Sequence, residues 1–120
     1  MRPFPSFALF CLLAMGAARP AFAATYYVTN NADEASSGSL RWAIATAASG
    51  DTIRFSAPYE ITLSTVGDTS YGPTAFLIDK ALTIDGNGGV LRRSTNVTNL
   101  RFFRNTSSLV LSNLTLMGGR

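Results

Sequence analysis

The feature that most constrains the fold is a segment that occurs twice, at Phe76–Gly89 and at Ser108–Gly119. When the two copies are aligned, Leu82-Thr83-Ile84 coincides with Leu114-Thr115-Leu116, and Ile61-Thr62-Leu63 is a weaker third copy. Alternation with a period of two residues predicts a strand with one buried face, and the glycines that follow predict a turn. A strand and turn that recur along the chain indicate coils that stack on one another. We therefore expect Leu82 and Ile84 to stack on Leu114 and Leu116, directly or across an intervening layer.

Residues 1–23 have the features of a signal peptide. Arg2 gives a positive start, residues 7–18 are apolar, and Ala21-Phe22-Ala23 fits a small-x-small cleavage site. The apolar core is too short to cross a membrane, and no later segment of the sequence is long and apolar enough. We therefore expect a folded domain at residues 24–120 with no transmembrane span after cleavage. Its location would be secreted or cell-surface, which is compatible with the outer membrane.

The amino-acid composition argues against several classes of function. The sequence has one cysteine, Cys11, and no histidine, so the processed chain would have neither a disulfide nor an imidazole. The formal charge of +3 comes from 10 basic and 7 acidic residues, and Arg2 and Arg19 leave with the signal peptide. The remaining balance of about +1 lacks the basic footprint that nucleic acid requires, so we expect no nucleic-acid partner.

One helix is predicted, from Ser39 to about Ala48. Apolar residues recur there at i, i+3, i+4 and i+7, which places them on one face. These residues are Leu40, Ala43, Ile44 and Ala47. Ser37 or Ser39 can cap the start of the helix, and Gly50 lies just past its end.

The sequence pattern predicts short strands in the rest of the domain. They are residues 25–30, 51–55, 60–64, 77–78, 82–84, 90–91 and 100–103. Residues 85–89 predict a tight corner, and residues 65–74 predict a loop that leaves the coil.

Two motifs resemble a known family. Gly38-Ser-Leu-Arg-Trp-Ala-Ile44, followed by Ala47-Ala-Ser-Gly-Asp-Thr-Ile53, resembles the N-terminal (C/G)SLRxAI…A…GDTI motif of exported bacterial right-handed parallel β-helix repeat proteins. Leu82-Thr-Ile-Asp-Gly86, and Leu114-Thr-Leu116 with Gly118-Gly119, look like the coil motif of the same group. This family has the pectate-lyase-like superfold and overlaps with polymorphic outer-membrane and autotransporter-type surface proteins. Gly38 stands where many relatives carry Cys.

The resemblance implies an all-β fold, namely the first few coils of a right-handed parallel β-helix with one N-terminal capping α-helix. In such folds the helix lies across the open end of the stack. The residues agree with that role, because a helix with one apolar face must bury it, and the first coil offers both a core and an edge. Leu40, Trp42 and Ile44 are therefore the expected structural cap residues, with Trp42 packed against the first coil rather than protruding.

The strand positions expected to face outward lack the groups that a catalytic site on this superfold would need. Glycoside hydrolysis needs two positioned carboxylates, and lyase chemistry needs carboxylates for a metal and a basic residue. The positions expected to face outward on the strands are Thr62, Thr83 and Thr115, which supply neither. Asp79 and Asp85 are both expected to have structural roles, and Asp85, which precedes Gly86-Asn87, is expected to hydrogen-bond the turn backbone. We assign no catalytic residue, no metal and no cofactor.

Arg92, Arg93, Arg101 and Arg104 form the only local bias of charge. Stacked on adjacent coils, they would form a basic stripe able to contact an acidic glycan or lipopolysaccharide phosphates. A merely solvated surface is the alternative interpretation.

The predicted function is an exported or cell-surface structural or adhesion-type module without a catalytic site in this portion. The alternative is the N-terminal end of a polysaccharide lyase or glycoside hydrolase whose active site lies in later coils. A small β-sandwich or lectin-like domain is a third hypothesis. No capping unit follows the last repeat before Arg120, so we expect a chain truncated at its C-terminus, with downstream coils of the same protein as one partner and polysaccharide or cell-surface glycan as another.

Overall fold

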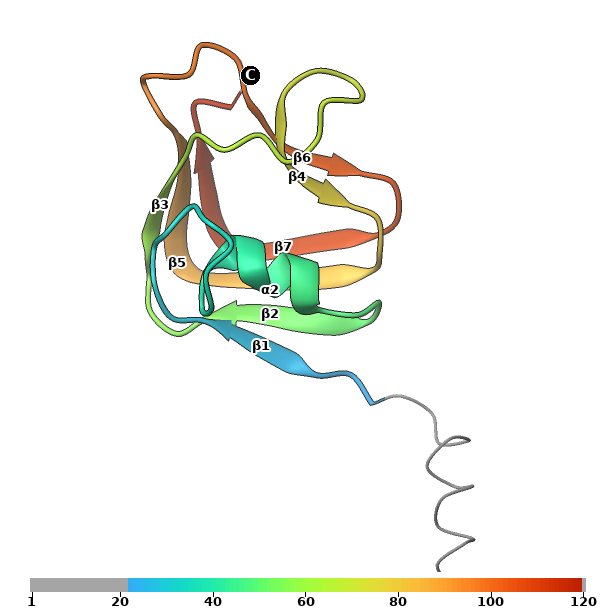
Figure 1. Ribbon diagram of the computed structural model, residues 1–120. Coiled ribbons are helices and arrows are strands. Elements are labelled where there is room, and N and C mark those ends of the chain that lie inside the picture. Colours follow the sequence, from blue (N-terminus) through green and yellow to red (C-terminus); the bar gives the residue numbers. More distant parts are fainter. Residues whose placement is uncertain (1–21, 120) are drawn as a thin grey trace, which may run out of the picture.

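The strands of this protein wind into a solenoid of about three turns (Figure 1). The computed structural model describes residues 22–119. The predicted signal peptide therefore lies outside the described residues except for Phe22 and Ala23. The elements are β1 (Thr25–Val28), α2 (Leu40–Thr46), β2 (Asp51–Phe55), β3 (Glu60–Leu63), β4 (Thr74–Ile78), β5 (Leu82–Arg93), β6 (Arg101–Asn105) and β7 (Leu109–Met117).

Each turn stacks its strands in parallel on those of the turn before. One side of the coil carries β1, β2 and the first halves of β5 and β7, while a second side carries β3 and the second halves of β5 and β7. The third side carries β4 and β6. All pairs between the named strands are parallel, so the predicted stacked coil is confirmed, and the named strands of residues 22–119 do not form a β-sandwich. The one antiparallel bridge in this part of the chain, Asp68 with Thr74, closes the loop before β4.

Side chains at alternate strand positions fill the interior. Ile53 of β2 lies beside Ile84 of β5, which in turn lies beside Leu111 of β7. Ile53 and Ile84 have no exposed surface, whereas Leu111, on the last turn, is partly exposed. The core therefore thins toward β7, where no further strand covers it within residues 22–119.

The predicted corner at residues 85–89 is confirmed as a bend inside the long strand β5. Asn87 (φ 51°) and Gly88 (φ 85°) adopt the left-handed conformation that a sharp change of direction requires. Asn113 (φ 52°) makes the equivalent bend in β7. Asp85 joins the two corners, because its Oδ1 accepts hydrogen bonds from the Asn87 backbone N–H (3.0 Å) and from Asn113 Nδ2 (3.2 Å).

The predicted register between the two repeats is wrong. Leu82 and Ile84 pair with Leu109 and Leu111, and Leu116 pairs instead with Leu91. The two apolar–Thr–apolar triplets lie on different sides of the coil, since one precedes the corner of β5 and the other follows the corner of β7. An apolar–Thr–apolar triplet indicates a half-buried strand, and every side of the coil contains such strands. The triplet alone therefore does not identify residues that are neighbours in adjacent turns.

Helix α2 begins as predicted but ends earlier. Ser39 is its N-cap, and Ser39 Oγ accepts a hydrogen bond from the Trp42 N–H at 3.0 Å. Ala47 is already extended (ψ 149°), so the helix ends at Thr46 rather than near Ala48. In Figure 1, α2 lies across the coil interior. Gly50 (φ 96°) belongs to the turn that leads into β2.

Candidate functional site

The side of the molecule that carries α2 is held together by Asp33 and Arg41. Arg41 Nη2 lies 2.8 Å from Asp33 Oδ1, and both side chains are only 14% exposed. Asp33 Oδ2 also accepts hydrogen bonds from the backbone N–H groups of Ser64 and Thr65, each at 2.8 Å. Burial alone would raise the pKa of Asp33, but these hydrogen bonds and the Arg41 guanidinium outweigh it and hold the pKa below its usual value. Asp33 is therefore a fixed anion that ties the loop after β1 to the residues after β3.

Arg41 extends the same connection to β4. Its Nη1 donates a hydrogen bond to the Ala75 carbonyl oxygen at 2.7 Å, and its Nη2 donates one to the Thr65 carbonyl oxygen at 3.1 Å. The guanidinium also lies over the Phe76 ring, 4.5 Å from the centroid. One side chain on α2 thus binds carbonyl groups on two sides of the first full turn.

The predicted cap residues lie where α2 meets β1 and β2. Leu40 is fully buried, and Ile44 is 7% exposed. Trp42 is half-buried and packs edge-on against Tyr26 of β1, with ring centroids 5.9 Å apart and an interplanar angle of 80°. These three residues therefore contact the hydrophobic interior together.

Arg92 and Arg93, at the end of β5, bind groups of this chain. Arg92 Nε donates to Glu60 Oε2 at 2.6 Å, and this pair is exposed on the surface. Arg93 donates to the carbonyl oxygens of Val97 and Gly118. Arg93 therefore anchors the loop after β5 and the end of β7.

Arg101 and Arg104 lie on β6, in the other sheet. Arg104 pairs with Asp68 at 3.4 Å and lies over the Tyr71 ring, so it anchors the loop before β4. Arg101 has no carboxylate within ion-pair distance among residues 22–119. All four arginines belong to the same turn of the coil, so the predicted stripe across adjacent coils does not form. The reason is that residues 92–104 span only one passage from β5 to β6.

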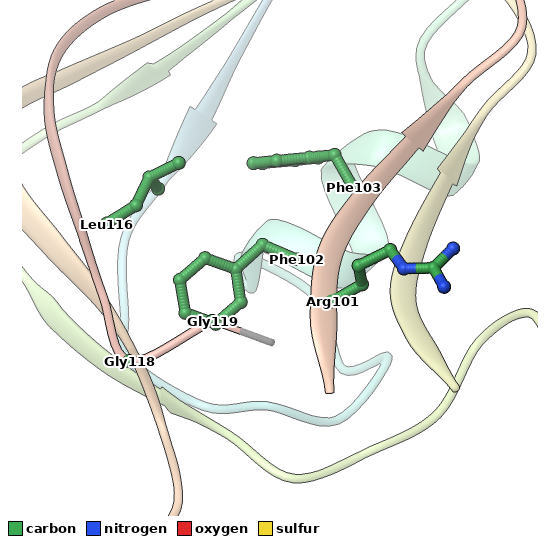
Figure 2. Close-up of a pocket in the computed structure, with 6 residues that line it drawn as sticks. All are labelled: Arg101, Phe102, Phe103, Leu116, Gly118 and Gly119. Carbon is green, nitrogen blue, oxygen red and sulfur yellow. The ribbon is translucent and has the colours of Figure 1, made fainter. Parts of the chain in front are cut away.

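Within residues 22–119, no further strand pairs with β7 on the last turn of the coil. A hollow of about 560 Å³ lies there. It is lined by Arg101, Phe102, Phe103, Leu116, Gly118 and Gly119 (Figure 2). In Figure 2, Phe102 and Leu116 face the hollow, whereas the Arg101 side chain extends away from it. Leu116 (43% exposed) and Met117 (42%) leave apolar surface in water on the last strand.

The predicted acidic candidates lie in turns. The pKa of Asp85 is lowered, first by the hydrogen bond from the Asn87 backbone and then by Asn113 and Arg54, so this carboxylate is held in its charged form at the corner. Asp79 lies beside Lys80 in a hollow between α2 and β4. Within residues 22–119, no group of three or more His, Cys, Asp or Glu side chains could hold a metal ion.

Comparisons with protein-family models, with curated proteins and with solved structures found no match to this chain. The two ends of the solenoid differ in what they expose. At one end, α2 and its polar contacts lie against β1, β2 and β4, and at the other end Leu116 and Met117 expose apolar side chains.

Sequence reasoning had not assigned a role to Asp33, Arg41 or Asp51. Arg41 carried the clearest signal, because it stands within the (C/G)SLRxAI motif beside a buried leucine. A charged residue next to the apolar face of a short helix is a candidate for binding backbone carbonyls at the edge that the helix covers.

Proposed function

We propose that this protein is an exported structural or adhesion-type module, in which α2 closes one end of a right-handed parallel β-helix and the other end receives a further coil of the same architecture. The observation that carries the proposal is the contrast between the two ends. A solenoid needs a unit that covers its first edge, and it extends by burying the apolar side chains of its last turn.

The contacts of α2 support the capping role. Uncovered strand edges expose backbone groups that can pair with other chains. Arg41 binds the Ala75 and Thr65 carbonyl oxygens, while Asp33 binds the N–H groups of Ser64 and Thr65. Together with buried Leu40, they cover apolar and polar parts of the first turn at once.

The open end supports extension by another coil. Leu116 continues the interior column that begins at Ile61 and passes through Leu91. Leu91 is fully buried between its neighbours, whereas Leu116 is 43% exposed. Burial of apolar surface stabilises by roughly 25 cal/mol per Å², so covering this turn would be favourable. The right-handed winding in the proposal is supported by the strong preference of parallel strands for right-handed crossovers.

Export and a surface location are supported by the sequence of residues 1–23. Among the described residues, no helix is long and apolar enough to span a membrane. The outward strand faces would be available for polysaccharide or cell-surface glycan, and the exposed Arg101 on β6 forms no ion pair within residues 22–119. Cell fractionation of the expressed chain tests the export, and recovery only in the cytoplasm would contradict it.

Self-association tests the open end. We expect sedimentation velocity to show concentration-dependent association of the chain, because copies bury the exposed apolar end against one another when no further coil is present. Leu116→Lys should abolish the association by placing a charge in the hollow. The matched control is Ala45→Lys, which puts the same charge on the exposed surface of α2 at the opposite end. A chain that stays monomeric at high concentration, or equal effects of both variants, would refute the assignment.

A further inference from the structure

Asp51 is a buried carboxylate beside the predicted cleavage site. It is the first residue of β2, and it is only 6% exposed. Its Oδ1 accepts a hydrogen bond from the Ala24 backbone N–H at 2.9 Å, and its Oδ2 accepts one from the Ala48 N–H at 2.8 Å. The carboxylate therefore connects the first residue of the predicted processed chain to the turn after α2.

Ala24 is special because the expected cleavage site precedes it. In the uncleaved chain its nitrogen is a neutral amide. Hydrolysis of the Ala23–Ala24 bond by a signal peptidase consumes one water and yields the Ala23 carboxylate and an α-ammonium group on Ala24. We propose that Asp51 is the receiving site for the α-ammonium group of Ala24 that signal cleavage creates. The inference rests on the proposed export, since export supplies the peptidase.

The surroundings fit this assignment. Phe22 is 78% exposed, and both Ala23 and Ala24 lie at the surface, so nothing in the described part of the chain covers the bond to be cut. A hollow of about 340 Å³ adjoins Asp51 and is lined partly by Ser49 and Gly50. It offers room for the hydration of a new ammonium group. Within residues 22–119, the hydrogen bond that Oδ1 accepts comes from the Ala24 nitrogen itself.

The charge balance at Asp51 also favours the pairing. The hydrogen bond from Ala24, then that from Ala48, and to a smaller extent the charge of Lys80 lower the pKa of Asp51, so it is an anion at neutral pH. Lys80 Nζ donates a hydrogen bond to the Ala47 carbonyl oxygen at 2.5 Å, and Tyr26 is among the residues that line the hollow. An ammonium group would convert an amide–carboxylate hydrogen bond into a charge-assisted one, which is shorter and stronger.

The pairing would make the processed chain more stable than the precursor. It would tie the start of β1 to the turn that follows α2, next to the end that we propose is closed. A paired α-ammonium group should also keep its proton above the ordinary α-amino pKa of about 7.7–8.0. Its stabilisation should be complete below that value, and it should vanish as the pH rises through the higher folded-state pKa.

The test uses the exported protein. The complete 120-residue chain is expressed in a bacterial host, the product is purified from the cell envelope fraction, and its N-terminus is determined by mass spectrometry. Half of the product is then acetylated near pH 6.5, where an α-amine reacts in preference to a lysine ε-amine because its reference pKa is lower, and the sequence has a single lysine, Lys80. We expect the free-amine form to have a Tm about 4 °C higher at pH 6.5, and the difference to disappear near pH 10.5.

Two variants separate the specific pairing from general effects. Asp51→Asn should abolish the difference between free and acetylated forms. The matched control Asp85→Asn also alters an aspartate that accepts a backbone hydrogen bond, but it should leave the difference intact. If Asp51→Asn does not fold, the pH profile of the wild-type pair still decides.

Three outcomes would count against the inference, and they are distinguishable. Equal Tm values for free and acetylated wild-type chains would overturn the pairing and leave the export standing. Cleavage at another bond would overturn the assignment of Ala24 in the same way. A precursor that remains uncleaved in the cytoplasm would refute the proposed export as well.

Discussion

Replacement of Arg41 by methionine removes the guanidinium group but keeps an unbranched apolar side chain. The change deletes hydrogen bonds to the carbonyl oxygens of Asp33, Thr65 and Ala75, and it leaves the Asp33 carboxylate without its cation. A hydrogen bond to a charged group contributes roughly 1.5–3 kcal/mol. Water can replace part of this, because the site is at the surface of the fold. We therefore expect a net loss of about 2 kcal/mol, which corresponds to a Tm lower by about 10 °C in a domain of this size.

The matched control is Arg92→Met. Arg92 also pairs with a carboxylate, that of Glu60, but the two side chains are 43% and 53% exposed. Exposed ion pairs contribute about 0–1 kcal/mol, so this variant should unfold close to wild type. Urea unfolding followed by circular dichroism measures both variants. Equal losses would refute the claim that Arg41 holds the covered end of the coil together.

Three further predictions follow from the same contacts. Leu40→Asp should unfold or aggregate the domain, because it places a charge at a fully buried position, whereas Ala45→Asp on the exposed face of α2 should remain soluble in the same gel-filtration assay. Gly86→Ala should destabilise by about 1–3 kcal/mol in thermal unfolding, since an added Cβ would lie 2.5 Å from Leu114 Cδ1, and wild-type stability would contradict the corner packing. The pKa of Asp33 is lowered in the folded state, so the stabilisation by its carboxylate is complete above about pH 4 and is lost as the pH falls through the folded-state pKa. Asp33→Asn should therefore weaken the dependence of the free energy of unfolding on pH below about pH 4. An unchanged dependence would show that Asp33 is not a bound anion.

Local patterns in the sequence predicted the elements that depend on neighbouring residues. The N-cap at Ser39 and the corner at residues 85–89 are encoded by short-range chemistry, and both occur as expected. The strand faces were also predictable, because Ile53 and Ile84 alternate with polar residues and are buried.

Long-range relations were not predictable in the same way. The register of β5 on β7 depends on the number of residues that each corner contains. Residues 86–88 separate Asp85 from Gly89, whereas only Asn113 separates their register partners Ser112 and Leu114, so the register shifts at the corner. Helix α2 ends at Thr46 because Ala47 is extended, and Lys80, far along the chain, donates a hydrogen bond to the Ala47 carbonyl oxygen there. No spacing rule within the sequence contains that information.

For the polar residues of the candidate site too, the sequence indicated local features but not the long-range contacts. The sequence showed that four arginines lie close together at residues 92–104, but the carboxylates that pair with two of them, Glu60 and Asp68, come from another turn of the coil. Asp33 and Arg41 were overlooked because neither belongs to a recognised ligand pattern, and their role depends on which strand edges the fold leaves uncovered.

Disulfide trapping tests the parallel stacking of β5 on β7 most directly. No cysteine occurs after Cys11, so a processed chain can carry two introduced thiols. Thr83 and Val110 are register partners on the outer face, whereas Thr83 and Thr115 coincide only in the alignment of the two repeats. Cysteines whose Cα atoms lie within about 4.4–6.8 Å can form a disulfide. We expect Thr83→Cys with Val110→Cys to cross-link under mild oxidation and Thr83→Cys with Thr115→Cys to remain reduced, and the reverse pattern would contradict the stacked solenoid.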